Sequence, residues 1–109
     1  MTVHRLRNLT GRNPAGSVEL KTMGLSFPGQ ERARQMGELR RGNQHWNVLL
    51  ETEPDGTLGT VRGRIHFVSM DRHRVTSWIF MEWQEREVQE RFSEFSAAEL
   101  WQFLEALPD

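Results

Sequence analysis

The chain contains no cysteine and no tyrosine among its 109 residues, and Lys21 is its single lysine. The missing thiols exclude a disulfide framework, a zinc site with thiolate ligands, an iron–sulfur cluster and a cysteine nucleophile. No stretch approaches the roughly 18 consecutive apolar residues of a membrane span. Residues 1–7 also lack the apolar region of a signal peptide. We therefore expect a cytoplasmic chain that has no disulfides and does not contact a membrane.

Positive charge is carried almost entirely by arginine, which supplies thirteen of the fourteen basic residues. Residues 1–74 hold twelve basic and seven acidic side chains, a net charge of +5. Residues 75–109 hold two basic and eight acidic side chains, a net charge of −6, so that the whole chain carries −1. We expect these halves to pair within the fold, to pair between two copies, or to offer two different surfaces to partners.

Length and composition fit one small domain that spans residues 1–109. Alternation of apolar and polar residues predicts strands, because successive side chains of a strand point to opposite faces. The ranges with this pattern are 3–9, 17–23, 44–53, 60–70 and 74–84. A stretch rich in glycine, asparagine and proline at 8–16 predicts a loop between the first two.

Two further segments have patterns that a strand and a helix share. Residues 30–41 are largely polar, and their apolar positions fall three apart: Ala33, Met36 and Leu39. This spacing predicts a short helix or a loop inserted at 30–41. Residues 85–95 fit either structure, and we predict a strand there because Ser96 begins a new helix.

The C-terminal helix has the clearest signal. Ser96 and Glu99 have the spacing of a capping box, in which each side chain bonds the backbone of the other residue. The apolar stripe that follows has helical spacing: Leu100, Phe103, Leu104 and Leu107. We predict an α+β fold, an antiparallel β meander of about four to six strands packed by a C-terminal α-helix.

The central hairpin, residues 44–70, has a predicted turn at 53–57, where Pro54 and Gly56 suit a tight reversal. A register that separates apolar from polar side chains pairs three couples: Trp46 with Ile65, Leu50 with Val61, and His45 with His66. A β-bulge near Gly59 would reconcile this register with the turn. One face of the hairpin then carries the polar candidates: His45, Asn47, Arg62, Arg64 and His66.

Those polar residues form the candidate binding surface. If Trp78 and Phe80 of the next strand share their face, arginines and rings together form a platform for single-stranded nucleic acid. In the alternative, both rings pack beneath a helix and the arginines lie in solvent. A second alternative has His45 and His66 sharing a metal. No metal-ligand motif is present, so we expect neither a metal nor a cofactor.

No catalytic residues can be assigned from the sequence. The acidic side chains of residues 82–94 alternate with glutamine and arginine, which is typical of a solvated surface. Trp101 lies beside the apolar stripe of the last helix and is predicted to contact a second copy. We expect a small non-enzymatic module that binds another macromolecule, with a protein as partner and a homodimer as one form. The alternative is a module that binds single-stranded nucleic acid through the arginine and aromatic face.

Overall fold

The sheet and its helices are built from residues 26–108 and the short segment 2–3, which are the residues that this computed structural model describes. The elements in chain order are β1 (Thr2–Val3), η2 (Gln30–Arg32), β2 (Ala33–Arg41), β3 (Gln44–Asp55), β4 (Thr60–Val68), β5 (His73–Val75), β6 (Phe80–Glu82), α2 (Glu85–Ser93) and α3 (Ala97–Ala106). The predicted strand at 17–23, the loop at 8–16 and most of the predicted strand at 3–9 lie outside the described residues.

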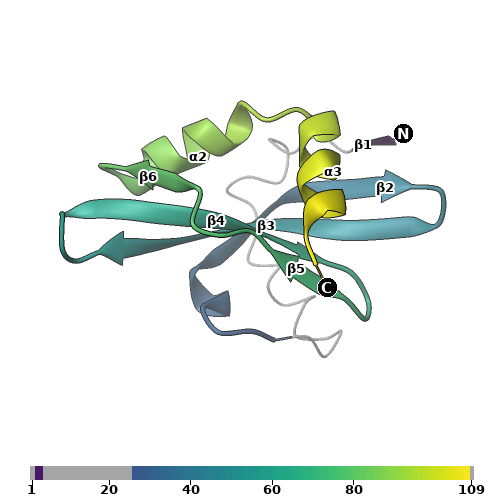
Figure 1. Ribbon diagram of the computed structural model, residues 1–109, viewed down its shortest axis with the longest axis horizontal. Helices are drawn as coiled ribbons and strands as arrows, with labels where there is room; N and C mark the ends of the chain where they lie inside the picture. The colour runs from purple at the N-terminus through teal and green to yellow at the C-terminus, as the bar shows by residue number, and fades with distance from the viewer. Residues whose placement is uncertain (1, 4–25, 109) are drawn as a thin grey trace.

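The described strands form one antiparallel sheet of six, in the order β1-β2-β3-β4-β5, with β6 also paired to β4. Helices α2 and α3 lie over the same side of the sheet (Figure 1). The predicted α+β class, an antiparallel meander packed by a C-terminal helix, is confirmed. The predicted cap of α3 is also present, because Glu99 N donates to Ser96 Oγ at 3.1 Å and Ser96 N donates to the Glu99 carboxylate at 2.8 Å.

The side of the sheet under the helices, which we call the helix-covered face, holds the main core. Trp46, Val48 and Leu50 of β3 lie on it with Ile65 and Phe67 of β4. The helices add five further buried side chains: Val88, Phe92, Leu100, Trp101 and Leu104. Alternation on β3 and β4 had predicted this face. The opposite face also buries a smaller apolar cluster, Leu49 of β3 and Val68 of β4 with Ala33 and Phe27.

The register of the central hairpin was predicted wrongly by four residues. Leu50 lies opposite Ile65, and Val61 lies opposite Pro54 rather than Leu50. An even-numbered slip leaves every side chain on its predicted face, since faces alternate with a period of two. Pairing runs without a bulge from Asn47 to Asp55, so the bulge predicted near Gly59 is also wrong.

The turn of this hairpin lies at 56–59, later than predicted, and β3 continues through Pro54. Gly59 N donates to Asp55 O at 3.1 Å, and Gly59 takes a φ of 73°, which its missing side chain permits. Strand alternation directs the position of the missing Pro54 N–H away from β4 and toward the side of β2. Strand β2 pairs with β3 only as far as Glu51, so the proline costs no hydrogen bond of the sheet.

Residues 33–41 form strand β2, so the predicted helix or loop is wrong there; only Gln30–Arg32 forms a helical turn, of 3-10 type. The pairing with β3 shifts by one residue between Gln35 and Gly37, which marks a β-bulge at Met36. A bulge reverses the alternation. It therefore places Met36 and Leu39, three residues apart, on the same face, which is the spacing that had indicated a helix. Ala33, before the bulge, lies on the other face with Leu49 and Val68.

Residues 85–93 form helix α2, so the strand predicted at 85–95 is wrong. Val88 and Phe92, one helical turn apart, are both fully buried against the sheet. The helix begins after Gln84, whose backbone N donates to the Glu87 carboxylate at 3.0 Å. Glutamine is not among the residues that usually cap a helix N-terminus, so the sequence did not indicate that a helix begins here.

The strand predicted at 74–84 is divided into β5 and β6, with residues 76–79 between them. At this break the backbone N of Ile65 donates to the hydroxyl of Thr76 at 3.0 Å, while Thr76 N donates to Ile65 O. A side chain therefore replaces one backbone acceptor of the ladder, and β4 changes its partner from β5 to β6. None of the helices described is long and apolar enough to cross a membrane.

Gly63 provides a test of this packing. A Cβ atom at Gly63 would lie 2.6 Å from Cγ1 of the buried Val88 and 3.4 Å from Phe80 Cδ2. We expect Gly63→Ala to lower the free energy of unfolding by about 1–3 kcal/mol, because a packed core resists added volume. Gly56→Ala is the matched control, since no atom lies within 4 Å of its added methyl group. Urea unfolding of both variants measures the difference, and equal stability of the two would contradict the packing described.

Candidate functional site

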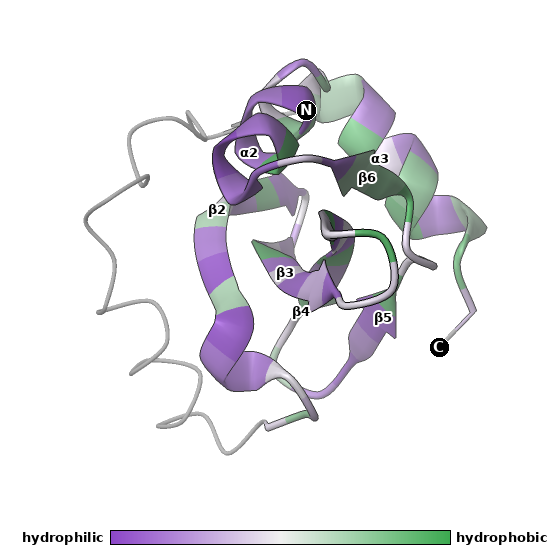
Figure 2. Cartoon of the chain, turned by 90° about the vertical axis from the view of Figure 1, so that its left-hand side faces the viewer, coloured by the Kyte–Doolittle hydropathy of each residue, from purple (hydrophilic) through white to green (hydrophobic). Residues whose placement is uncertain are grey.

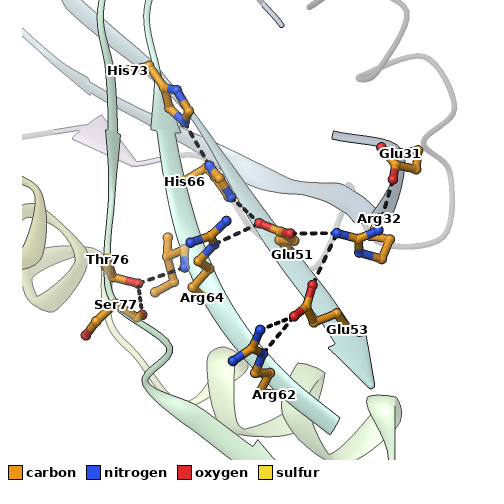
Figure 3. Close-up of polar contacts among 11 residues, drawn as sticks. Glu31, Arg32, Glu51, Glu53, Arg62, Arg64, His66, His73, Thr76 and Ser77 are labelled. Atoms are coloured by element: carbon orange, nitrogen blue, oxygen red, sulfur yellow. Dashed lines mark hydrogen bonds and ion pairs between the residues drawn. The ribbon is translucent and has the colours of Figure 1, made fainter. Parts of the chain in front are cut away.

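The side of the sheet opposite the helices, which we call the network face, is organised around Glu51 of β3. The Glu51 side chain is only 1% exposed. Its Oε1 atom accepts hydrogen bonds from Arg64 Nε at 2.8 Å and from His66 Nε2 at 2.7 Å, both on β4 (Figure 3). The alternation of β3 and β4 places these three side chains together, because Glu51 lies directly opposite Arg64.

Arg32 of η2 extends this network from the other side. Its guanidinium lies 3.5 Å from Glu51 Oε2 and donates to Glu53 at 3.2 Å and to Glu31 at 2.9 Å. Arg62 donates to Glu53 through Nε at 2.8 Å and also through a terminal nitrogen. The network therefore joins three carboxylates to three guanidinium groups and has no net charge.

The position of η2 depends on a close approach by Gly29. Its φ of 87° lies in the left-handed region, and an added Cβ would collide with the Glu51 carboxylate. Glycine is therefore required on both counts, since other residues rarely adopt this φ. This approach brings Arg32 to the carboxylate.

A chain of two histidines leads away from Glu51. His66 Nδ1 lies 2.8 Å from His73 Nε2. Because a carboxylate only accepts, His66 carries its proton on Nε2; its Nδ1 is then the acceptor, and His73 Nε2–H is the donor. Phe27 covers both imidazoles, with ring centroids 4.3 Å and 4.6 Å from theirs. The chain thus fixes one tautomer of a fully buried imidazole.

Protonation in the network follows from burial and these contacts. Burial lowers the pKa of His66 to about 4, although the hydrogen bond to Glu51 opposes this shift. Burial and the nearby Arg64 also lower the pKa of His73. Burial acts to raise the pKa of Glu51, but hydrogen bonds from His66 and Arg64 outweigh it and leave that pKa lowered. At neutral pH, Glu51 is therefore ionised and His66 is neutral.

The structure brings together four of the residues predicted to form a binding surface: Arg62, Arg64, His66 and Trp78. Arg62 and Arg64 lie on the network face, and each guanidinium carbon is 4.2 Å from the ring centroid of the half-buried Trp78. His66 lies on the same face but is 1% exposed, so it has almost no surface for a partner. The arginine and aromatic cluster therefore exists, with its charges balanced by Glu51 and Glu53.

Four other predicted residues lie elsewhere. His45 is separated from His66, because the residue opposite His66 is Leu49. The His45 ring lies 2.6 Å from the Glu38 carboxylate. His45 and Asn47 border a hollow of about 350 Å³. Asn47 accepts from Gln35 at 2.9 Å. Two aromatic residues are in the core: Phe80 and Trp101. Trp101 thus packs against the sheet of its own chain, and Phe80 lies on the face opposite Trp78.

The sequence did not identify a cluster of exposed apolar residues around β6. These residues, which we call the β6 patch, are Leu58, Ile79, Met81 and Trp83. Trp83 is 70% exposed and Met81 49% exposed. Figure 2 shows the hydrophobic colour of β6 beside the hydrophilic outer side of α2. The alternation at 79–83 was in the sequence, but only the pairing of β6 shows that no strand of residues 2–3 and 26–108 lies on its outer side.

The part of the chain that the structure describes contains no group of histidine, aspartate and glutamate side chains arranged to hold a metal ion. No protein-family model, curated protein or solved structure matches the chain, so no activity or partner is transferred to it from a relative.

The buried histidine predicts a pH dependence of stability. In the unfolded chain, His66 becomes protonated as the pH falls below 6.5, the ordinary pKa of histidine. In the folded chain, it stays neutral until the pH reaches about 4. Stability present above pH 6.5 is therefore lost progressively between pH 6.5 and 4, by roughly 3 kcal/mol at most.

Urea unfolding across this range measures the effect, and we expect His66→Gln to show a shallower loss than the natural chain. An unfolding free energy of the natural chain that stays constant from pH 6.5 to 4 would contradict the buried, neutral state of His66.

Proposed function

We propose that the chain is a small cytoplasmic protein-binding module without catalytic activity, and that the β6 patch is its binding surface. The observation that carries this proposal is the exposure of Trp83, which is 70% exposed. Tryptophan is strongly enriched among the residues that dominate protein interfaces. Exposed apolar patches of this kind are typical of interaction sites.

The other members of the patch belong to β6, to the residue before it and to the turn before β4. Met81 pairs with Arg62 at the start of β4, and Thr60 donates to the Met81 sulfur at 3.1 Å. Leu58, which is 66% exposed, belongs to the turn that leads into β4. The patch is therefore a group of exposed apolar side chains at one end of the sheet.

The polar network supports binding over catalysis as the role of this chain. Its most unusual titratable group, His66, is buried and held by two partners. A general acid or base must reach the proton it transfers, directly or through one water molecule. The groups with altered pKa values in the network instead form hydrogen bonds to its other side chains.

Site-specific photocrosslinking tests the proposal in cells that make the protein. With photoreactive benzoylphenylalanine in place of Trp83, we expect a discrete covalent adduct with one protein, which can be a second copy. The control places the same residue at Met70, which is 81% exposed in a different turn. Adducts at neither position, or equal adducts at both, would argue against the β6 patch as a binding surface.

The alternative proposal is binding of single-stranded nucleic acid, supported by the contacts of Arg62 and Arg64 with Trp78. Bases stack on such rings while guanidinium groups contact phosphate. The pairing of both arginines with carboxylates weakens this proposal, because a phosphate would have to compete with Glu51 and Glu53.

Fluorescence anisotropy with labelled oligonucleotides separates the two proposals. We expect no affinity tighter than about 10⁻⁴ M at physiological salt, because the paired guanidinium groups release few counterions. Tighter binding that weakens with salt, and that Arg62→Ala reduces while Arg86→Ala does not, would favour the nucleic-acid proposal. Circular dichroism of both variants controls for folding.

A further inference from the structure

Strand β6 exposes the backbone of its central residue, Met81. On β4, Ile65 and Gly63 direct their carbonyl groups toward the side of β5 and β6, since these oxygens accept from Thr76 N and Ile79 N. In an antiparallel ladder, neighbouring residues direct their backbone groups to opposite sides. On β6, the residues that hydrogen-bond to β4 are therefore Glu82, opposite Val61, and Phe80, opposite Gly63. The N–H and C=O groups of Met81, which lies between them, point away from β4.

That outer side has no neighbouring strand within residues 2–3 and 26–108. Natural sheets protect such edges with lysine, proline or a bulge. Here the outward position is a methionine that is 49% exposed. The β6 edge thus combines an unpaired backbone with apolar side chains, which is what a further strand requires.

The exposed side chains of this segment alternate. Ile79, Met81 and Trp83 are exposed, whereas Phe80 is buried and Glu82 is half-buried. An antiparallel two-fold axis at Met81 would place Met81 opposite its own counterpart, with Ile79 beside Trp83 of the second copy through side chains alone, because the Ile79 N–H is bonded to Gly63 O. The apolar row is therefore complementary to itself, as an interface between identical subunits must be.

The charges around β6 are compatible with a second copy. Glu82 is paired with Arg91 at 3.3 Å, and Arg62 is paired with Glu53. The whole chain carries a net charge of only −1, so two copies repel each other weakly. A strongly charged partner would find no unpaired charge of opposite sign at Glu82 or Arg62.

We propose that the partner at the β6 patch is a second copy of this chain, with the two β6 strands paired antiparallel about a two-fold axis at Met81. This inference rests on the proposed function of the β6 patch as a binding surface. It joins the two sheets into one sheet that continues through both copies.

Sedimentation equilibrium from low to high micromolar concentration tests the inference. We expect the natural chain to approach twice its monomer mass, and Met81→Lys to weaken dimerisation at least about tenfold, because it places like charges opposite each other. Met70→Lys is the matched control, the same change at another exposed methionine, and should leave dimerisation unchanged. A monomeric natural chain, or a dimer that persists in Met81→Lys, would overturn the proposal.

The absence of cysteine allows a direct test of register. Directly opposed residues that share backbone hydrogen bonds have Cα atoms about 5.5 Å apart, within the range that a disulfide spans. We expect Met81→Cys to form a disulfide between copies under mild oxidation, and Trp83→Cys and Met70→Cys not to do so. Efficient linkage through Cys at position 83 alone would show a different register and refute the axis at Met81.

These experiments separate the two proposals. A photocrosslink from position 83 to a different protein, with a monomeric natural chain, would refute the dimer and support the protein-binding function. The absence of both a crosslink and self-association would overturn both proposals.

Discussion

An ionised carboxylate that barely contacts water must be stabilised by fixed donors, since its burial is otherwise strongly unfavourable. Glu51 is such a group, and its donors come from separate parts of the chain. Arg64 and His66 reach it from β4, and Arg32 reaches it from η2. The contact between Arg32 and the Glu51 carboxylate therefore holds the segment before β2 against the network face. Gly29 has no side chain and leaves the space that this approach needs.

The same demand explains how the arginine-rich part of the chain is used. Arginine offers a planar fork of donors and a flat surface that stacks on aromatic rings. Arg62 and Arg64 use both properties, because each binds a carboxylate and stacks on Trp78. Elsewhere Arg41 lies 4.2 Å from the ring centroid of Trp101. Several of the arginines that the composition suggested for a partner thus contact carboxylates and aromatic rings of their own chain.

The parts of the fold that sequence could predict are those governed by simple periodicity. The two faces of the central hairpin and the helix after Ser96 followed from alternation and from a capping box. Strand β2 was missed because the bulge at Met36 interrupts its alternation, and helix α2 was missed because Val88 and Phe92 fit both periods. Register was missed because the turn lies at 56–59, after a proline that a strand end tolerates.

The candidate site divides in the same way. Placing Arg62, Arg64 and His66 on one face required only alternation. Recognising Glu51 as the acceptor of Arg64 and His66, and Glu53 as the acceptor of Arg62, required the register, because the four-residue slip decides which side chains lie opposite each other. The exposure of Trp83 depended on tertiary structure, since a tryptophan after a short strand is as compatible with a core as with a surface.

The break at Thr76 divides the edge of β4 between two short strands, β5 and β6, each joined to β4 by three residue pairs. Strand β6 is joined to β4 by three residue pairs and is flanked by irregular segments, whereas nine pairs join β3 to β4. Segments with few backbone bonds open locally at lower free energy than the core. We therefore infer that β6 can detach and reattach while the hairpin and the Glu51 network stay closed, so that amide hydrogens at this edge exchange with solvent before those of β3 and β4.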